Sequence, residues 1–314
     1  MFINTTGFYI PTQRIPNDYF LEVNGLTRDW IFQRTGIESR SKTENGENGV
    51  TMGKAAVARA IENLPYPLDK VDLIISAGYT PMDTVGTLAH HIQREFGIEN
   101  AASIMISSAC SSVVNALEIV EGYFATNKAS TALIVSSENN SYYSNETDPQ
   151  SGHLWGDAAV AMFISKERFT GNEPEVLCIT TRGLGHVGKG PYGVFLSPKD
   201  VGLVMPDGRD VFVNATKYMI DALSTVSRNC GIAIEELDYI IAHQANKRIV
   251  NNVLHQLDIP ENKSLNNIHN YGNTGSASAF LVMMENLDKF QKGTHVGITV
   301  FGGGYSSGAT LIRF

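Results

Sequence analysis

Cys110 has the residue type and the position needed for nucleophilic chemistry. The segment SSACSSVVNAL (107–117) places it after an apolar, β-branched run and before residues at helical spacing. A thiol at the start of a helix meets unpaired backbone N–H groups and the positive end of the helix dipole, which lowers its pKa. The pattern therefore predicts a thiolate able to attack a thioester. The alternative is a small buried core residue, as most free cysteines are.

The segment IIAHQANKRIV (240–250) places His243 at the end of a predicted strand and Asn246 one turn into the next helix. Ligands bind at the carboxyl ends of strands in α/β proteins, so His243 is well placed for proton or oxyanion chemistry. A histidine considered alone is more often structural. The other seven histidines take that interpretation.

Two glycine-rich segments complete the set of candidate residues. NIHNYGNTGSASAF (267–280) places Asn273 between glycines, before a helix start made of small residues. VFGGGYSSGATLIRF (300–314) has Gly302–Gly304 between two predicted strands. Such glycines either allow a β-bulge or let backbone N–H groups approach a ligand, as in an oxyanion hole. Taken singly, the first segment is more often a turn and the second more often a bulge.

The elements that position these residues follow an alternating pattern of apolar, β-branched runs and helix-like segments. This pattern predicts an α/β protein with sheets buried on both faces. The order of segments occurs twice, which indicates an internal duplication with halves at 1–166 and 167–314. The segments are 71–79, 90–98, 103–108, 111–127, 130–138 and 158–166, then 210–231, 237–243, 244–259, 276–290 and 294–304.

Composition excludes several classes of protein. The chain has 314 residues, is 43% apolar, and carries a net charge of −8, which argues against nucleic acid or an anionic membrane as the main partner. The sequence contains no leader pattern and no run of roughly 18 apolar residues, so we expect a cytoplasmic location and no membrane span. Three widely spaced cysteines, without a CxxC pair, are expected to be separate thiols and not metal ligands.

Four motifs, SACSS, HQAN, GNTGSAS and FGGGYSSGA, together resemble in order and spacing those of the β-ketoacyl-acyl-carrier-protein synthase III family of the thiolase superfamily. The resemblance covers nearly the whole chain, because it extends to DWIFQRTGIESR (29–40), WGDAAVAMF (155–163), DGRDVF (207–212) and the terminal LIRF. HQAN and GNT at this separation are its most specific part. The resemblance favours the nucleophile interpretation of Cys110.

The resemblance implies a thiolase-like fold with duplicated βαβαβαββ halves in a layered α-β-α-β-α arrangement. The first half, 1–166, would carry the nucleophilic cysteine, and the second half, 167–314, the histidine and asparagine. Each half would have a five-stranded mixed sheet, with Cys110 at the N-terminus of a buried central helix. The family's members are homodimers, so a homodimer is expected.

The resemblance also implies the reaction. Cys110 would take an acyl group from a primer thioester. His243 and Asn273 would then hydrogen-bond the thioester oxygen of malonyl-carrier protein during decarboxylation, and the carbanion would attack the acyl-enzyme to give a β-ketoacyl product. The backbone N–H groups of Cys110 and Gly303 would form the oxyanion hole. No metal or redox cofactor is implied, because the substrates are coenzyme A or phosphopantetheine thioesters.

Other matched residues would bind the substrate. By the resemblance, Trp30 and Arg34 contact the nucleotide end of coenzyme A, although Trp30 is equally compatible with a packed core aromatic. Asn246 would support the active-site hydrogen bonds and the pantetheine arm, and Phe212 and Phe301 would line the substrate site.

The carrier protein is acidic, which makes Lys247 and Arg248 candidates for its dock. The alternative for these two residues is that they are solvated surface charges.

Three departures from the family bear on the primer. Ser111 and Ser112 follow the nucleophile where a small residue and glycine are usual, which predicts a different pocket wall and weakens the case for simple acetyl priming. Val85 stands where short-chain enzymes have a bulky aromatic gate, which predicts a longer or bulkier acyl group. Pro149 replaces the arginine that sandwiches the adenine opposite Trp30, which favours a primer delivered on a carrier protein.

The resemblance leaves three functions to compare. Fatty-acid initiation is the first. The second is a specialised-metabolism ketosynthase of dialkylresorcinol, quinolone or polyketide type that uses a longer acyl or β-ketoacyl carrier. A non-catalytic acyl-carrier-binding subunit is disfavoured because Cys110, His243 and Asn273 are all present. The related 3-hydroxy-3-methylglutaryl-CoA synthases have a catalytic glutamate where Tyr79 stands here, which argues against their reaction.

Overall fold

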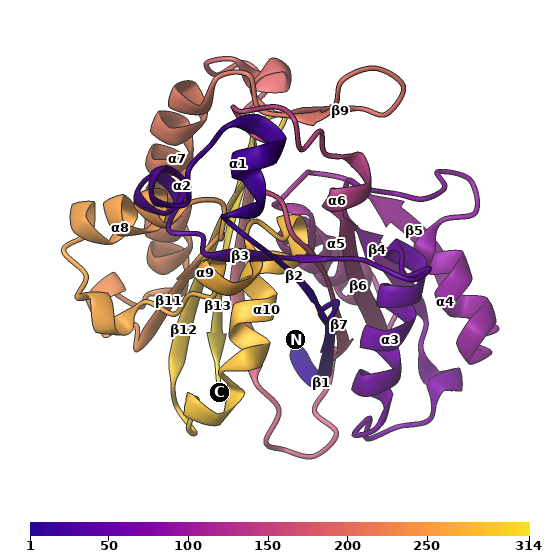
Figure 1. The fold of residues 1–314 in the computed structure, drawn as a ribbon. Coiled ribbons are helices and arrows are strands. Elements are labelled where there is room, and N and C mark those ends of the chain that lie inside the picture. Colours follow the sequence, from indigo (N-terminus) through magenta and orange to yellow (C-terminus); the bar gives the residue numbers. More distant parts are fainter.

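The computed structural model describes all 314 residues and is built around a nine-stranded mixed sheet (Figure 1). In chain order the strands are β1 (Phe2–Tyr9), β4 (Leu73–Ala77), β5 (Ala102–Ile106), β6 (Thr131–Asn139), β7 (Asp157–Ser165), β8 (Glu175–Gly183), β11 (Tyr239–Ala242), β12 (His295–Gly302) and β13 (Ser306–Arg313). Across the sheet they lie in the order β11-β12-β13-β8-β1-β7-β6-β4-β5. β4 runs parallel to β5 and β6, and β11 runs parallel to β12; the other pairings are antiparallel.

The sheet consists of two similarly connected halves that join where β1 meets β8 through one residue pair, Phe2 with Glu175. From this junction outward, the strands of the first half lie in the order β1, β7, β6, β4 and β5, which are its first, fifth, fourth, second and third strands along the chain. The second half repeats the order first, fifth, fourth and second as β8, β13, β12 and β11. This repetition supports the predicted duplication, and the boundary at residue 166 stays a prediction.

The third strand of the second half is missing, so the prediction of five strands is right for the first half and wrong for the second. The segment that would supply it contains Pro260 and a short 3-10 helix, Glu261–Lys263. Proline has no N–H to donate to a strand ladder. Only Ser264 pairs with Ile240, through an isolated parallel bridge.

The helices form three layers around the two half-sheets, as the resemblance implied. α5 (Ser112–Ala125) and α10 (Ser278–Glu285) contact strands of both halves and make the middle layer. α3 (Gly49–Ile61) and α4 (Leu88–Phe96) cover the first half, and α7 (Gly208–Cys230) and α8 (Lys247–Gln256) lie over the second (Figure 1). The largest hydrophobic core, 32 buried residues, surrounds α5 and α10. The α-β-α-β-α arrangement is therefore confirmed.

β6 and β7 are covered on both faces and buried at every position, and most of their residues are apolar, although β6 ends in a buried polar stretch, Ser136–Asn139. None of the helices is both long and apolar enough to cross a bilayer.

The remaining elements are α1 (Tyr19–Asn24), α2 (Arg28–Thr35), α6 (Asn140–Tyr143), α9 (Ile268–Tyr271), the hairpin of β2 (Gln13–Pro16) with β3 (Ser39–Lys42), the hairpin of β9 (Phe195–Ser197) with β10 (Gly202–Val204), and six short 3-10 helices.

Two of the three cysteines form a disulfide, so the prediction of separate thiols is wrong for them. Cys178 on β8 is bonded to Cys230 at the end of α7, with 5.8 Å between their Cα atoms. Their separation of 52 residues carries no sequence signal, because only the packing of α7 against β8 brings them together. Cys110 is the one free cysteine of the chain.

Candidate active site

Cys110 lies in the tight turn between β5 and α5, at the N-terminus of the middle-layer helix as predicted. It is 9% exposed. Ala109, just before it, has a φ of +49°, in the left-handed region that a non-glycine residue enters at an energetic cost. The surrounding structure must therefore hold this turn in place, and in doing so it fixes the direction of the thiol.

Ser111 and Ser112 supply that support and do not form a pocket wall. Ser112 Oγ accepts a hydrogen bond from Ser108 N (2.9 Å) and donates to Ala109 O (2.6 Å). Ser111 Oγ lies 2.7 Å from Ser108 O and 2.6 Å from Ser306 Oγ. Both serines are fully buried, and neither lines the catalytic pocket. The prediction that they change the wall next to the thiol, and with it the argument against acetyl priming, is wrong.

The loop after β12 brings its backbone directly against the nucleophile turn. A Cβ on Gly302 would lie 2.5 Å from Ser108 O and 2.8 Å from Cys110 N, so only glycine permits this approach. The backbone N–H groups of Gly303 and of Cys110 itself both reach the Cys110 sulfur. Two backbone donors thus converge where an oxyanion next to the sulfur would form.

His243 follows β11 and is held by a serine of α10. Its Nδ1 lies 2.6 Å from Ser278 Oγ, which also accepts a hydrogen bond from Gln244 N (3.4 Å). Because Nδ1 is the only acceptor that the Ser278 hydroxyl contacts, we assign the hydroxyl proton to Nδ1, which places the imidazole hydrogen on Nε2. Burial lowers the pKa of His243 to about 4, so the ring is neutral at physiological pH. Nε2–H is then a fixed donor.

Asn273 is locked between the two halves of the chain. Its N–H donates to Leu154 O (2.8 Å), and its C=O accepts from Gly156 N (2.9 Å). Its Oδ1 accepts from Gly275 N (3.0 Å), which leaves Nδ2, a donor, for the pocket. The side chain is 4% exposed and oriented before any ligand arrives.

Cys110, His243, Asn273 and Gly303 line one pocket that encloses about 680 Å³ of empty space. They come from four segments separated by up to about two hundred residues, and each lies at the end of a strand or the start of a helix. The predicted substrate residues Asn246, Phe212 and Phe301 line the same pocket. The arrangement combines a nucleophile, two backbone donors beside it, and two side-chain donors opposite.

Comparisons with known proteins agree with this geometry. The family model described as 3-oxoacyl-[acyl-carrier-protein (ACP)] synthase III matches residues 105–182, and the model of its C-terminal part matches residues 228–314. The β-ketoacyl-[acyl-carrier-protein] synthase III of Acholeplasma laidlawii is 32% identical, over 99% of this chain and 97% of its own. The chain belongs to the β-ketoacyl-[acyl-carrier-protein] synthase III family. Membership makes it a condensing enzyme of the acyltransferase type.

Solved structures of synthase III proteins have the same fold. That of 3-oxoacyl-[acyl-carrier-protein] synthase III from Aquifex aeolicus has a TM-score of 0.92 at 28% identity, covering 100% of this chain and 99% of its own. The priming β-ketosynthase of the R1128 polyketide pathway has a TM-score of 0.89 at 26% identity, covering 99% and 95%. The thiolase-like fold is thereby shown.

The thiol of this synthase III chain does not have the lowered pKa that its position at a helix start suggested. Burial, followed by the charge of Glu138, raises the pKa of Cys110 to about 12. The helix start and the two backbone donors oppose these effects without overcoming them, because the side chain is removed from water. Cys110 is therefore a thiol at neutral pH.

Trp30 and Arg34, which were matched to coenzyme A binding, are not among the residues that line the pocket. The Arg34 guanidinium stacks 4.5 Å from the centre of the Trp30 ring, and His153 packs against the same ring at 5.6 Å. Asn246 Nδ2 donates to Arg34 O (3.0 Å), which connects α2 to the pocket wall. Pro149, in place of the usual arginine, is exposed.

Lys247 and Arg248 are the first two residues of α8 and follow Asn246, which lines the pocket. Arg248 is exposed, and its guanidinium lies 6.0 Å from the ring centre of Phe212, which lines the pocket. Lys247 is half-buried, because its side-chain carbons pack where a Cβ on Gly36 would lie. A partner that binds these two charges would therefore lie next to Asn246 and Phe212 of the pocket wall.

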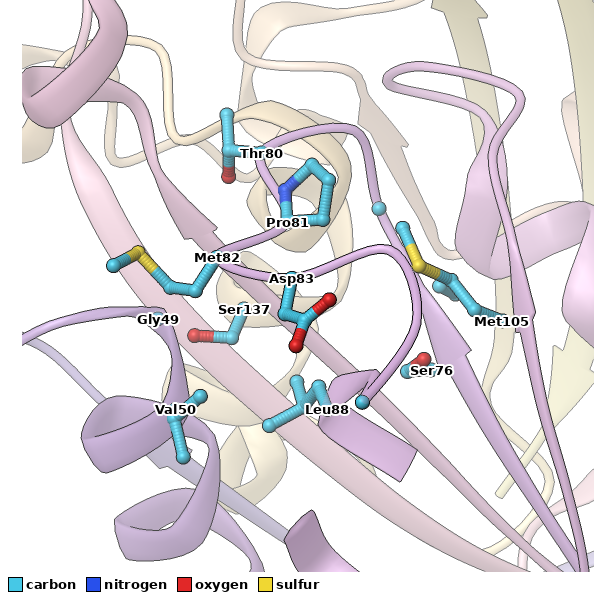
Figure 2. A pocket seen from close by; sticks show the side chains of 13 residues that line it. Gly49, Val50, Ser76, Thr80, Pro81, Met82, Asp83, Leu88, Met105 and Ser137 are labelled. Atoms are coloured by element: carbon cyan, nitrogen blue, oxygen red, sulfur yellow. The ribbon is translucent and has the colours of Figure 1, made fainter. Parts of the chain in front are cut away.

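Val85 is not brought to the catalytic pocket of its own chain. It is 84% exposed, on the loop between β4 and α4. Figure 2 shows the recess beneath this loop, which is lined by Met82 and Asp83 together with Ser76, Ser137 and other residues from β4–β6 and the starts of α3 and α4. The recess encloses about 410 Å³ and shares no lining residue with the catalytic pocket. Any contact of Val85 with substrate would have to be made in a neighbouring subunit.

Sequence reasoning missed a polar cluster beside the nucleophile. Glu138, fully buried at the end of β6, accepts hydrogen bonds from Tyr79 N (3.2 Å), Thr80 N (3.1 Å) and Ser276 Oγ. Burial raises the pKa of Glu138 to about 7. The sequence signal that could have revealed Glu138 was a charged residue at the end of the apolar run IVSSE. Ser278 gave no such sequence signal, because nothing in GNTGSAS distinguishes it from the other small residues of that motif.

Proposed function

We propose that this chain catalyses the initiating condensation of fatty-acid synthesis. Acyl transfer from a primer thioester to Cys110 is followed by decarboxylative Claisen condensation with malonyl-acyl-carrier protein, which gives a β-ketoacyl-carrier product. The observation that carries the proposal is the convergence of Cys110, His243, Asn273 and the Gly303 N–H on one pocket. The proposed chemistry uses no metal or redox cofactor.

In the first step the Cys110 sulfur attacks the primer carbonyl. The new C–S bond forms first and gives a tetrahedral intermediate. Its collapse breaks the old C–S bond, and the thiol proton ends on the departing thiolate of coenzyme A or phosphopantetheine. The carbonyl oxygen becomes negative in the tetrahedral intermediate. The N–H groups of Cys110 and Gly303 are close enough to the sulfur to stabilise that oxygen.

In the second step the malonyl thioester loses CO₂ and leaves an enolate. Nε2–H of His243 and Nδ2–H of Asn273 donate to the thioester oxygen as its charge develops. The enolate carbon then attacks the acyl carbonyl on Cys110 and a C–C bond forms. The C–S bond to Cys110 breaks, and the released thiolate takes a proton from solvent. A neutral His243 suits this role, because it donates without having to lose or gain a proton.

The specialised-metabolism alternative is not favoured. The relatives at 30–32% identity over nearly the whole chain are β-ketoacyl-[acyl-carrier-protein] synthase III proteins. The polyketide-pathway structure at 26% identity supports that alternative only weakly. The buried positions of Ser111 and Ser112 also remove one argument for an unusual primer.

Acyl carrier protein is the proposed partner, as the names of the relatives state for those proteins. Lys247 and Arg248, which follow the pocket residue Asn246, are the proposed contacts for its acidic surface. With Pro149 in place of an adenine-stacking arginine, Arg34 and Trp30 are the remaining contacts proposed for coenzyme A.

We further propose a homodimer. β5 is the edge strand of the sheet, and its apolar residues Ile104, Met105 and Ile106 are only half-buried. An apolar strand edge without a partner is suited to pairing with another chain. Val85 lies exposed on a nearby loop, where a partner would cover it. Light scattering on the purified protein should give twice the chain mass, and a monomer would contradict the proposal.

The function is tested by incubating the protein with a panel of acyl-coenzyme A and acyl-carrier thioesters of increasing length. We expect intact-mass measurement to show one acyl adduct, mapped to Cys110, and malonyl-carrier protein to discharge it as a β-ketoacyl product. A variant with Lys247→Ala and Arg248→Ala should slow acylation of Cys110 by acyl-carrier thioesters and leave acylation by acyl-coenzyme A unchanged. Absence of any adduct across the panel would contradict the proposed function.

A further inference from the structure

Tyr79 lies against the nucleophile, and none of the roles described so far uses it. Its hydroxyl is within hydrogen-bonding reach of the Cys110 sulfur and donates to Asn140 Oδ1 at 2.8 Å. Asn140 Nδ2 in turn donates to Gly156 O (2.8 Å) and Asn273 O (3.3 Å). The hydroxyl therefore connects the thiol to the segment that holds Asn273.

The space for this hydroxyl depends on a glycine in the GNTGSAS motif. Gly275 has a φ of +61°, and a Cβ there would lie 2.6 Å from Tyr79 Oη and 2.9 Å from Glu138 Cγ. The backbone of Tyr79 is fixed by its N–H bond to Glu138 Oε1 at 3.2 Å. Ring and backbone are thus both constrained, and the hydroxyl has little freedom except rotation of its proton.

We propose that Tyr79 is a further catalytic residue, which donates its hydroxyl proton in a hydrogen bond to the Cys110 sulfur as that sulfur becomes negative. In the resting protein the Tyr79 hydroxyl donates to Asn140. When the thiol proton leaves, the Tyr79 O–H turns from Asn140 to the sulfur. No covalent bond to Tyr79 forms, and Tyr79 keeps its proton.

The electrostatics of the site leave a thiolate on Cys110 without a cation to stabilise it. The titratable groups that face the thiol are Tyr79 and Glu138, with His243 across the pocket, and none of these is a cation at neutral pH. Burial and Glu138 both oppose a thiolate, and Tyr79 is the only side chain that counters them. A hydrogen bond to a charged group is strong enough to change the thiolate fraction about ten- to a hundred-fold.

The inference rests on the proposed role of Cys110 as nucleophile, and its test needs no thioester. Cys178 and Cys230 are disulfide-bonded, so alkylation by iodoacetamide, read by peptide mass, reports on Cys110 alone. We expect Tyr79→Phe to slow alkylation at pH 7.5 about ten- to a hundred-fold and to move its pH profile upward. Tyr143→Phe is the matched control, because the Tyr143 hydroxyl donates to Pro81 O, away from the thiol, and should change the rate less than about twofold.

Decarboxylation of malonyl thioester separates a role at the thiol from a general structural role. It should stay within about twofold in Tyr79→Phe, since His243 and Asn273 are unchanged. Equal or faster alkylation in Tyr79→Phe, or a parallel loss of decarboxylation, would overturn the inference. If Tyr79→Phe does not fold, Tyr79→Thr, whose hydroxyl is too short to reach the sulfur, must show the same slowed alkylation. If Tyr79→Phe slows alkylation of Cys110 as expected but the parent protein forms no acyl adduct, the result counts against the proposed function and leaves the role of Tyr79 at the thiol intact.

Discussion

Cys110→Ala is expected to abolish acyl transfer while malonyl-thioester decarboxylation remains measurable. Without the sulfur no acyl-enzyme can form, and loss of a nucleophile lowers turnover by at least about 10⁴-fold. Decarboxylation depends on the donors of His243 and Asn273, which are held by Ser278 and Gly275 and not by Cys110. Intact mass reports the adduct, and CO₂ release from malonyl-carrier protein reports the second reaction.

The small size of alanine makes this variant a clean test. The turn at Ala109 is held by the hydroxyls of Ser111 and Ser112, so removing the thiol leaves its supports in place. The melting temperature should therefore change by only a few degrees. An acyl adduct that persists on another residue, or loss of both reactions together in a folded variant, would contradict the assignment of Cys110.

His243→Ala is expected to show the opposite pattern, with acylation of Cys110 within about twofold of the parent and decarboxylation lowered about 10²–10³-fold. The lost group is one of two donors to the developing enolate oxygen. His255→Ala is a matched control, because that histidine is exposed on α8 and should leave both reactions unchanged. Loss of acylation with decarboxylation preserved would reverse the assigned roles.

The pH dependence of decarboxylation provides a second measurement on the same residue. Burial depresses the pKa of His243 to about 4, so its neutral, donating form is complete well above that pH and is lost only as the pH falls through about 4. We expect no change attributable to His243 between pH 6 and 8. A step near pH 6.5 that disappears in His243→Ala would show that the imidazole titrates normally, contrary to the neutral-donor mechanism.

The order of elements and the positions of the candidate residues were predictable from the sequence because each depends on a local pattern, and the roles of these residues stay predictions. Cys110, His243 and Asn273 lie at strand ends or helix starts, and a period of apolar residues marks such places. Family motifs then connected segments that periodicity alone leaves separate. The missing strand of the second half was also visible in principle, since Pro260 stands inside the segment that would form it.

Features that arise from tertiary packing were not predictable. The raised pKa of Cys110 comes from burial and from Glu138, 28 positions away in the sequence, and local reasoning saw only the helix start. The orientation of Ser111 and Ser112 depends on Ser306, which belongs to the other half. The bond of Cys178 with Cys230 depends on how α7 lies across β8. Each is set by a neighbour that is distant in sequence.

The reduction of one strand to the Ser264 bridge gives the nine-stranded sheet two unlike ends. At one end β5 offers five residues of open backbone, while at the other β11 is already bordered by the segment that contains Pro260. Strand addition can therefore extend the sheet in one direction only. When two copies pair through β5, both open ends are used, so the assembly closes at two chains and cannot grow into a fibre.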